Sequence, residues 1–223
     1  MTLTPEHRNR ALKVAALLAA EFPDLQIKSI AEVVRDYENR LTRFAYEVLN
    51  SKSDAIDFRR AHKAMLQDMG NRVSVEGWRE GGGKAEDFGD EETAYVDDWI
   101  RGQQGFVNDF AAWLASTDED GNRNNEGKRS YLATRIGQWV GALQNLGDIL
   151  RMKAKGDPFL TFDGDDGDES CDECQEYKGQ RHKLSWWEKR GLIARNGNEN
   201  FTCGRWTPCN HHFYDDNGKV VIQ

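Results

Sequence analysis

The sequence predicts a mainly α-helical protein: a helical bundle followed by a small C-terminal lobe that is stabilised by zinc and contains a short β-hairpin. Three observations predict this fold. Apolar residues recur at helical spacing up to Gly156, the composition changes sharply after that residue, and all four cysteines lie between Cys171 and Cys209. We therefore place a helical domain over residues 1–156 and a Cys/His-rich zinc lobe over residues 157–223.

Composition narrows the classes of function. The 223 residues include 30 Lys and Arg against 38 Asp and Glu, a net charge of −8, which argues against a protein that coats nucleic acid with a broad basic face. The longest apolar run, Val14–Ala20, is far below the ~18 residues needed to cross a bilayer, so no membrane partner is expected. Lys13 and Glu21 close that run, which disfavours a secretory signal and favours folding in a cytoplasm.

Three helices are predicted in the N-terminal part. The first begins at Thr4-Pro5-Glu6 and ends at Pro23, and Ser53-Asp54 caps the third. The apolar faces are Leu12, Ala15, Ala16, Ala19 and Phe22 in the first helix, Ile30, Val33, Val34, Tyr37, Leu41, Phe44 and Val48 in the second, and Phe58, Ala61, Met65 and Met69 in the third. Helices that each bury one stripe form a bundle. His7 and His62 lie on these helices, and we expect both to be solvated.

Two more helices are predicted after a glycine-rich break at residues 81–90, which we expect to be a flexible loop. The break is no phosphate-binding loop, because Trp78 and Ala85 replace a glycine and a hydroxyl that such a loop needs. The buried faces are Val96, Trp99, Gln103, Phe106, Phe110 and Trp113 in the fourth helix, and Leu132, Ile136, Trp139, Leu143, Leu146 and Leu150 in the fifth. A polar loop over residues 117–128 joins them. Gly137 and Gly141 are expected to allow close approach of a neighbouring helix.

The clustering of the cysteines indicates that they form one local site. Cys171 and Cys174 have the two-residue spacing that lets two thiolates bind one tetrahedral ion from a tight turn. The candidate metal ligands are Cys171, Cys174, Cys203, Cys209, His211 and His212. Soft thiolates favour structural Zn²⁺, and the spacing leaves open whether Cys209, His211 or His212 completes the site.

Other uses of the cysteines compete with structural zinc. Cross-paired disulfides would suit an oxidising compartment. A thioredoxin-like redox pair is disfavoured, because we expect no strand and helix around Cys171 and because the neighbouring acids raise the pKa of its thiol. Catalytic zinc needs an open coordination position, which four good ligands do not leave. We therefore expect no enzyme and no small-molecule substrate.

The rest of the lobe has three further features. Residues 213–222 predict a strand, an Asn-Gly turn and a second strand. Trp186-Trp187 supply apolar mass to a lobe in which the metal replaces a core. The acidic run from Asp163 to Glu169 is interpreted as a solvated linker, and His182 as a surface residue.

Two alternative functions come from these residues. A zinc-lobe adaptor or nucleic-acid-binding module would use interleaved basic and aromatic side chains to contact phosphates and stack bases. These are Arg181, Lys183, Lys189, Arg190, Arg195 and Arg205, with Trp186, Trp187 and Trp206. A metal-dependent hydrolase or transferase would use His211, His212 and the nearby acids.

The C-terminal part has a recognisable order of motifs. A helix begins near Lys128-Arg129, and an acidic segment, a Cys-x-x-Cys pair, a glycine and a distal Cys/His cluster follow it. Over roughly residues 128–214 this order resembles the phage head-morphogenesis family, the minor head proteins of the Mu F type. The matching residues are Asp166, Cys171, Cys174, Gly179, Cys203, Cys209 and His211.

The resemblance implies a minor structural protein of a tailed-phage virion. Such a protein is assembled in the host cytoplasm and is present in few copies inside the capsid, at or near the portal. It aids head morphogenesis or the packaging and delivery of DNA. The implied partners are the portal or other capsid proteins, with packaged DNA close by.

Overall fold

The computed structural model of the protein describes residues 29–117, 125–163, 172–193 and 212–222. The predicted helix over residues 4–22 lies outside these ranges. Four long helices run side by side: α2 (Ile30–Leu49), α3 (Ala55–Glu80), α4 (Asp90–Ala115) and α5 (Asn125–Lys153). The molecule is mainly helical with a small antiparallel sheet, as the sequence predicts.

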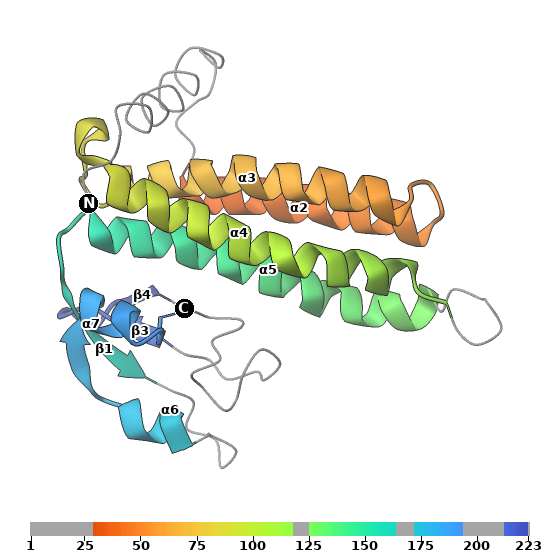
Figure 1. The fold of residues 1–223 in the computed structure, drawn as a ribbon. Coiled ribbons are helices and arrows are strands. Elements are labelled where there is room, and N and C mark those ends of the chain that lie inside the picture. The colour runs from red at the N-terminus through yellow and green to blue at the C-terminus, as the bar shows by residue number, and fades with distance from the viewer. Residues whose placement is uncertain (1–28, 118–124, 164–171, 194–211, 223) are drawn as a thin grey trace.

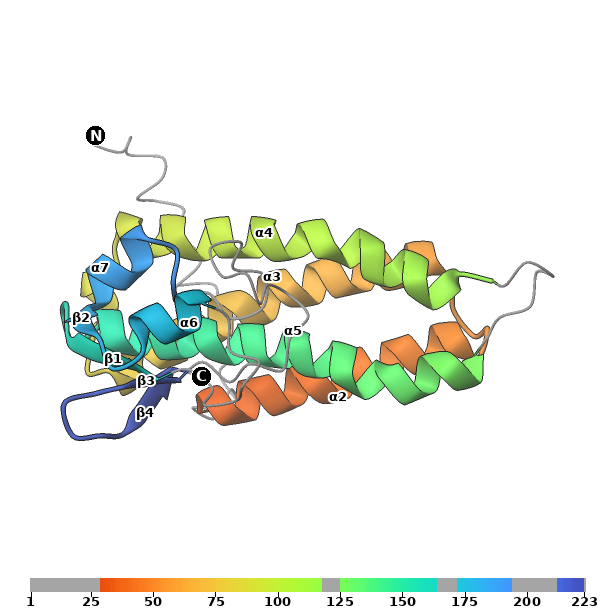
Figure 2. The same cartoon turned by 90° about the horizontal axis from the view of Figure 1, so that it is seen from below.

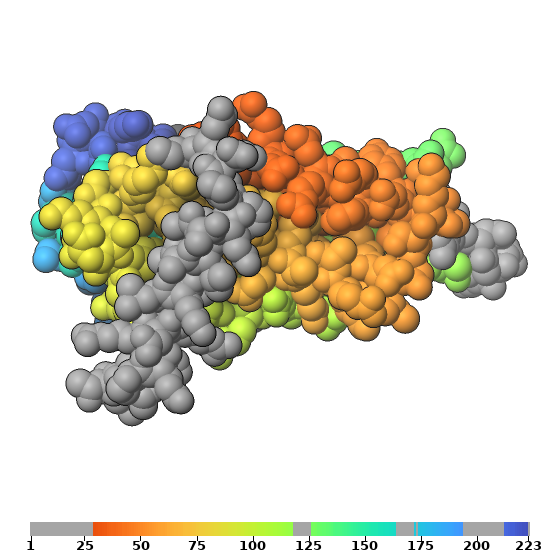
Figure 3. Space-filling view, turned by 90° about the horizontal axis from the view of Figure 1, so that it is seen from above, coloured from red at the N-terminus to blue at the C-terminus, as the bar shows by residue number. Residues whose placement is uncertain are grey.

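Local sequence signals start the first two of these helices. The hydroxyl of Ser29 accepts a hydrogen bond from the Glu32 N–H, and the Glu32 carboxylate accepts one from the Ser29 N–H, which forms a capping box. The Asp54 carboxylate accepts from the N–H groups of Ile56 and Asp57. From above, α2 and α3 form one continuous face of the molecule (Figure 3).

The break between α3 and α4 is confirmed, and it contains a short 3-10 helix, Ala85–Asp87. The Trp78 indole N–H donates to the Lys84 carbonyl at 2.9 Å and its ring packs edge-on against Phe88. One aromatic side chain thus ties both sides of the break to the end of α3.

The predicted buried face of α5 is confirmed. The buried face of α4 is rotated about the helix axis relative to the predicted one. All six predicted residues of α5 are buried, from Leu132 to Leu150. In α4 the buried residues are Val96, Ile100, Val107, Phe110, Ala111 and Leu114. Trp99, Phe106 and Trp113 are only half-buried and pack against the edge of the core.

The loop between α4 and α5 ends earlier than predicted, because Lys128 belongs to α5 and is buried. Its ammonium donates to the carbonyl oxygens of Leu114 and Ser116 at the end of α4. A cation at a helix C-terminus satisfies carbonyl groups that have no partner within the helix.

A close helix contact forms at glycines that the sequence analysis did not single out, and the prediction for Gly137 is wrong. Space around Gly137 is open, so it serves no close approach. Instead Gly77 of α3 meets Gly147 of α5: a Cβ at Gly77 would overlap the Gly147 carbonyl and lie 3.1 Å from its Cα. This contact sets the spacing of the two central helices.

The lobe contains more regular structure than the predicted hairpin. Its sheet has the order β2 (Arg181–Lys183), β1 (Phe159–Asp163), β3 (His212–Tyr214), β4 (Val220–Ile222), all antiparallel. The predicted hairpin is confirmed as β3 and β4, with Gly218 at a φ of +72° in the turn. Two short helices, α6 (Asp172–Tyr177) and α7 (Leu184–Lys189), complete it.

The sheet lies against one end of the bundle, beside the C-terminal part of α5 (Figures 1 and 2). One connected apolar core runs from the bundle into the lobe. Gly156 follows α5 at a φ of +94°, so the chain turns into the lobe where the boundary was placed. The division into a helical domain over residues 1–156 and a Cys/His-rich zinc lobe over residues 157–223 stays a prediction.

Candidate metal centre

Two of the six candidate metal ligands belong to the described residues. Cys174 lies in α6 and is 2% exposed, and His212 is the half-buried first residue of β3. Cys171, Cys203, Cys209 and His211 lie outside the described ranges. No group of three or more metal-binding side chains forms within residues 29–117, 125–163, 172–193 and 212–222, so the metal site over all six candidates stays a prediction.

The sheet register brings two chain ends together. Asp163, the last residue of β1, is the direct partner of His212. The chain leaves β1 there toward Cys171, and it enters β3 there from Cys209 and His211. The segments that carry the two cysteine groups therefore join the sheet at one end.

The turn after α6 attaches this helix to the same end of the sheet. The Gly179 N–H donates to the Phe162 carbonyl at 2.9 Å, and the Phe162 N–H donates to the Gln180 carbonyl at 3.0 Å. Gly179 has a φ of +74°, a conformation that favours glycine. Phe162 immediately precedes Asp163, so the turn after α6, the end of β1 and the start of β3 meet at this end of the sheet.

The donor atoms of the candidate ligands fit zinc. The expectation that no strand and helix lie around Cys171, however, is wrong. Thiolate sulfur and imidazole nitrogen are the preferred donors of structural Zn²⁺. A strand and a helix do flank the pair, because β1 ends at Asp163 and α6 begins at Asp172. The acids next to the pair still disfavour a thiolate, and they alone now disfavour a redox pair.

The lobe shares the apolar core of the bundle, so the expectation that a metal replaces its core is wrong. Trp187 is fully buried, and its indole N–H donates to the carbonyls of Leu160 and His182 at 3.2 Å each. Phe162 and Phe213 pack against its ring. Four strands and two helices supply enough apolar surface for this packing.

The basic and aromatic residues of the lobe are engaged with one another. His182 stacks on one face of Trp186 at 3.7 Å, and the Arg190 guanidinium lies 3.7 Å from the centroid of the same ring. Arg181 forms a bidentate ion pair with Asp216, at 2.7 and 2.9 Å, and Lys183 pairs with Asp157 at 3.5 Å. Arg195, Arg205 and Trp206 lie outside the described ranges.

This arrangement weakens the nucleic-acid alternative. Trp187 is inaccessible to a base, and Trp186 already has a stacking partner in His182 and a cation in Arg190. Base stacking on either ring would require these contacts to break.

The bundle contains a buried polar pair that sequence reasoning missed. His62 is 0% exposed, which contradicts the expectation of a solvated residue. Its Nε2 shares a 2.9 Å hydrogen bond with the Tyr37 hydroxyl, and the rings of Phe58, Phe110 and Trp139 surround it edge-on. Burial lowers the pKa of His62 from 6.5 to about 3, so the imidazole is neutral.

The spacing of α3 contained the signal for this pair. His62 lies four residues after Phe58 and three before Met65, both on the predicted apolar face. A fully enclosed neutral imidazole reaches no substrate. Its role is to satisfy the Tyr37 hydroxyl inside the bundle.

A second polar group joins the bundle to the lobe. Lys153 of α5 donates to Glu188 of α7 at 2.9 Å, and its ammonium lies 5.0 Å from the centroid of the Tyr95 ring in α4. Burial raises the pKa of Glu188, and the ion pair with Lys153 opposes that rise. Burial likewise raises the pKa of Tyr95. Three elements meet through this cluster.

Comparisons of the chain with protein-family models, with curated proteins and with solved structures found no match. Among the helices that the structure describes, none is long and apolar enough to cross a membrane.

Proposed function

We propose that this protein is a structural, non-catalytic minor head protein of a tailed-phage virion, bound to the portal or another capsid protein. In this proposal a zinc ion, held by the cysteines and a histidine of residues 171–212, stabilises the C-terminal lobe. The protein aids head morphogenesis or DNA packaging and delivery. The motif order of residues 128–214 supports the virion role, and the lobe geometry supports the metal site.

The observation that carries the metal site is the pairing of Asp163 with His212. Cys209 is three residues before His212, so covalent geometry keeps their Cα atoms within about 11 Å. Cys174 is held near the same end of the sheet through Gly179. The segments that carry the two cysteine groups therefore start from one end of the sheet, which supports their convergence on one tetrahedral ion.

The net charge supports a place close to DNA without tight binding. A chain of net charge −8 gains little from the release of phosphate counterions. The bundle core is packed mainly with apolar side chains, and its buried polar groups include the neutral His62–Tyr37 pair. Such packing suits a rigid element that docks on a protein surface.

The metal is tested by zinc content and thermal unfolding of the full chain. We expect about one zinc per chain in the wild type, and a loss of more than half of it in Cys174→Ser. His182→Asn is the matched control. His182 is half-buried in the same sheet as His212 but is not a candidate ligand. Wild-type protein that folds without zinc, or equal zinc loss in both variants, overturns the metal site.

The virion role is tested by fractionating heads of the phage that carries the gene. We expect the chain to sediment with the heads, to stay bound in high salt and to be present in few copies relative to the major capsid protein. Absence from purified heads contradicts the proposal. A salt-dependent shift of DNA by the purified chain would instead favour the nucleic-acid-binding alternative.

A further inference from the structure

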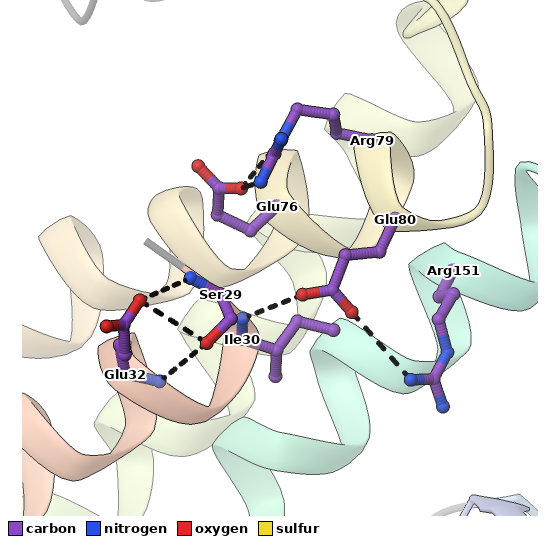
Figure 4. A network of polar contacts seen from close by, with 7 residues as sticks. All are labelled: Ser29, Ile30, Glu32, Glu76, Arg79, Glu80 and Arg151. Carbon is purple, nitrogen blue, oxygen red and sulfur yellow. Dashed lines mark hydrogen bonds and ion pairs between the residues drawn. The ribbon is translucent and has the colours of Figure 1, made fainter. Parts of the chain in front are cut away.

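Three helix ends and the last strand meet at Glu80 and Arg151 (Figure 4). One carboxylate oxygen of Glu80, at the end of α3, accepts a hydrogen bond from the Ile30 N–H of α2 at 3.0 Å. Its other oxygen lies 3.8 Å from Arg151 Nη1 near the end of α5. Both side chains are partly shielded, at 28% and 22% exposed.

Arg151 extends the network into the sheet. Its Nη2 donates to the Val221 carbonyl of β4 at 3.2 Å and lies 2.8 Å from Asp148 Oδ1. Burial raises the pKa of Asp148, and the charge of Arg151 opposes that rise. A continuous series of polar contacts thus runs from β4 through Arg151 and Glu80 to the first residue of α2.

Helix dipoles explain why these contacts form between elements. A carboxylate at the end of α3 faces the negative end of its own helix dipole, which is unfavourable. The N-terminus of α2 and the Arg151 cation offset this cost. The Ser29–Glu32 capping box is local to α2, whereas the bond from the Ile30 N–H depends on α3 and, through Glu80, on Arg151.

We propose that Glu80 and Arg151 form a clamp through which strand β4 stabilises the first turn of α2, the point where residues 1–28 join the bundle. Anything that orders the sheet also tightens the start of α2, and by thermodynamic reciprocity anything that holds the start of α2 also stabilises β4. Neither Glu80 nor Arg151 is a candidate metal ligand, and both lie in the helical bundle.

Amide hydrogen exchange of the full chain tests the clamp. In Arg151→Gln we expect residues 30–33 to exchange about five to ten times faster, because Arg151 pairs with Glu80, which in turn accepts the hydrogen bond from the Ile30 N–H of α2. The matched control is Arg79→Gln, which removes the ion pair with Glu76 on the same end of α3 (Figure 4). Unchanged exchange at residues 30–33, or equal acceleration in the control, overturns the clamp.

The same substitution in a Glu80→Ala variant distinguishes an effect of Arg151 that passes through Glu80 from a general loss of stability. In Glu80→Ala, residues 30–33 should already exchange faster, and adding Arg151→Gln should accelerate them by less than twofold. An additional acceleration as large as in the wild type would show that Arg151 does not act on α2 through Glu80.

Glu80→Gln keeps an acceptor for the Ile30 N–H but removes the charge that faces Arg151, so we expect faster exchange at residues 220–222. Unchanged exchange there contradicts the reciprocal effect, even where Arg151→Gln fails to fold.

Discussion

Replacing Gly77 by alanine is expected to lower the free energy of unfolding by roughly 3 kcal/mol or more. The new methyl group would overlap the carbonyl oxygen of Gly147, which is backbone and cannot rotate away. Gly147 is itself enclosed, because a Cβ there would lie 2.8 Å from Val73 Cγ2 and 3.1 Å from Ile30 Cγ2. Helices α3 and α5 would have to separate, which would also disturb the start of α2.

Urea unfolding followed by far-UV circular dichroism measures this loss. The matched control is Gly102→Ala on α4, where the added methyl group meets open space. That change should raise stability by about 0.5–1 kcal/mol, because alanine favours a helix more than glycine does. Similar effects of both substitutions would show that helix propensity, and not the contact between α3 and α5, decides the outcome.

Acid is expected to destabilise the protein through His62. Its pKa is about 3 in the folded protein and 6.5 as the ordinary value, so the unfolded chain binds a proton first as the pH falls. The His62 contribution is constant above pH 6.5 and is lost as the pH falls from there toward 3. The loss amounts to roughly 1 kcal/mol at pH 5.5 and roughly 3 kcal/mol at pH 4.5.

The double variant His62→Leu/Tyr37→Phe isolates this contribution. It removes the titrating ring without leaving the Tyr37 hydroxyl buried and unpaired. Between pH 7 and pH 4.5 its stability should fall by about 3 kcal/mol less than that of the wild type. Asp148 and Glu188 act in the opposite direction, since their raised pKa values favour the folded state as the pH falls. Parallel pH profiles of the two proteins would exclude His62 as the cause.

The bundle was largely predictable because its signals are local. Three–four spacing identified α2, α3, α4 and α5, and the carboxylate of Asp54 marked the start of α3. The orientation of α4 was not predictable, because several of its faces are apolar and the choice between Trp99 and Ile100 depends on the neighbouring helices. The strands of residues 159–163 and 181–183 were missed, because each is short and gains its pairing from distant residues.

The candidate metal site was likewise predictable only in part. Spacing in sequence identified Cys171 and Cys174 as a pair, and it could not show that Asp163 pairs with His212, since a strand register depends on the whole sheet. The chain by itself determined which segments become helices, because propensity, capping and periodicity act within a few residues. Tertiary structure alone decided that Gly77 meets Gly147, that His62 is enclosed and that Arg151 links β4 to α3. Each of these contacts joins residues that lie far apart in the sequence.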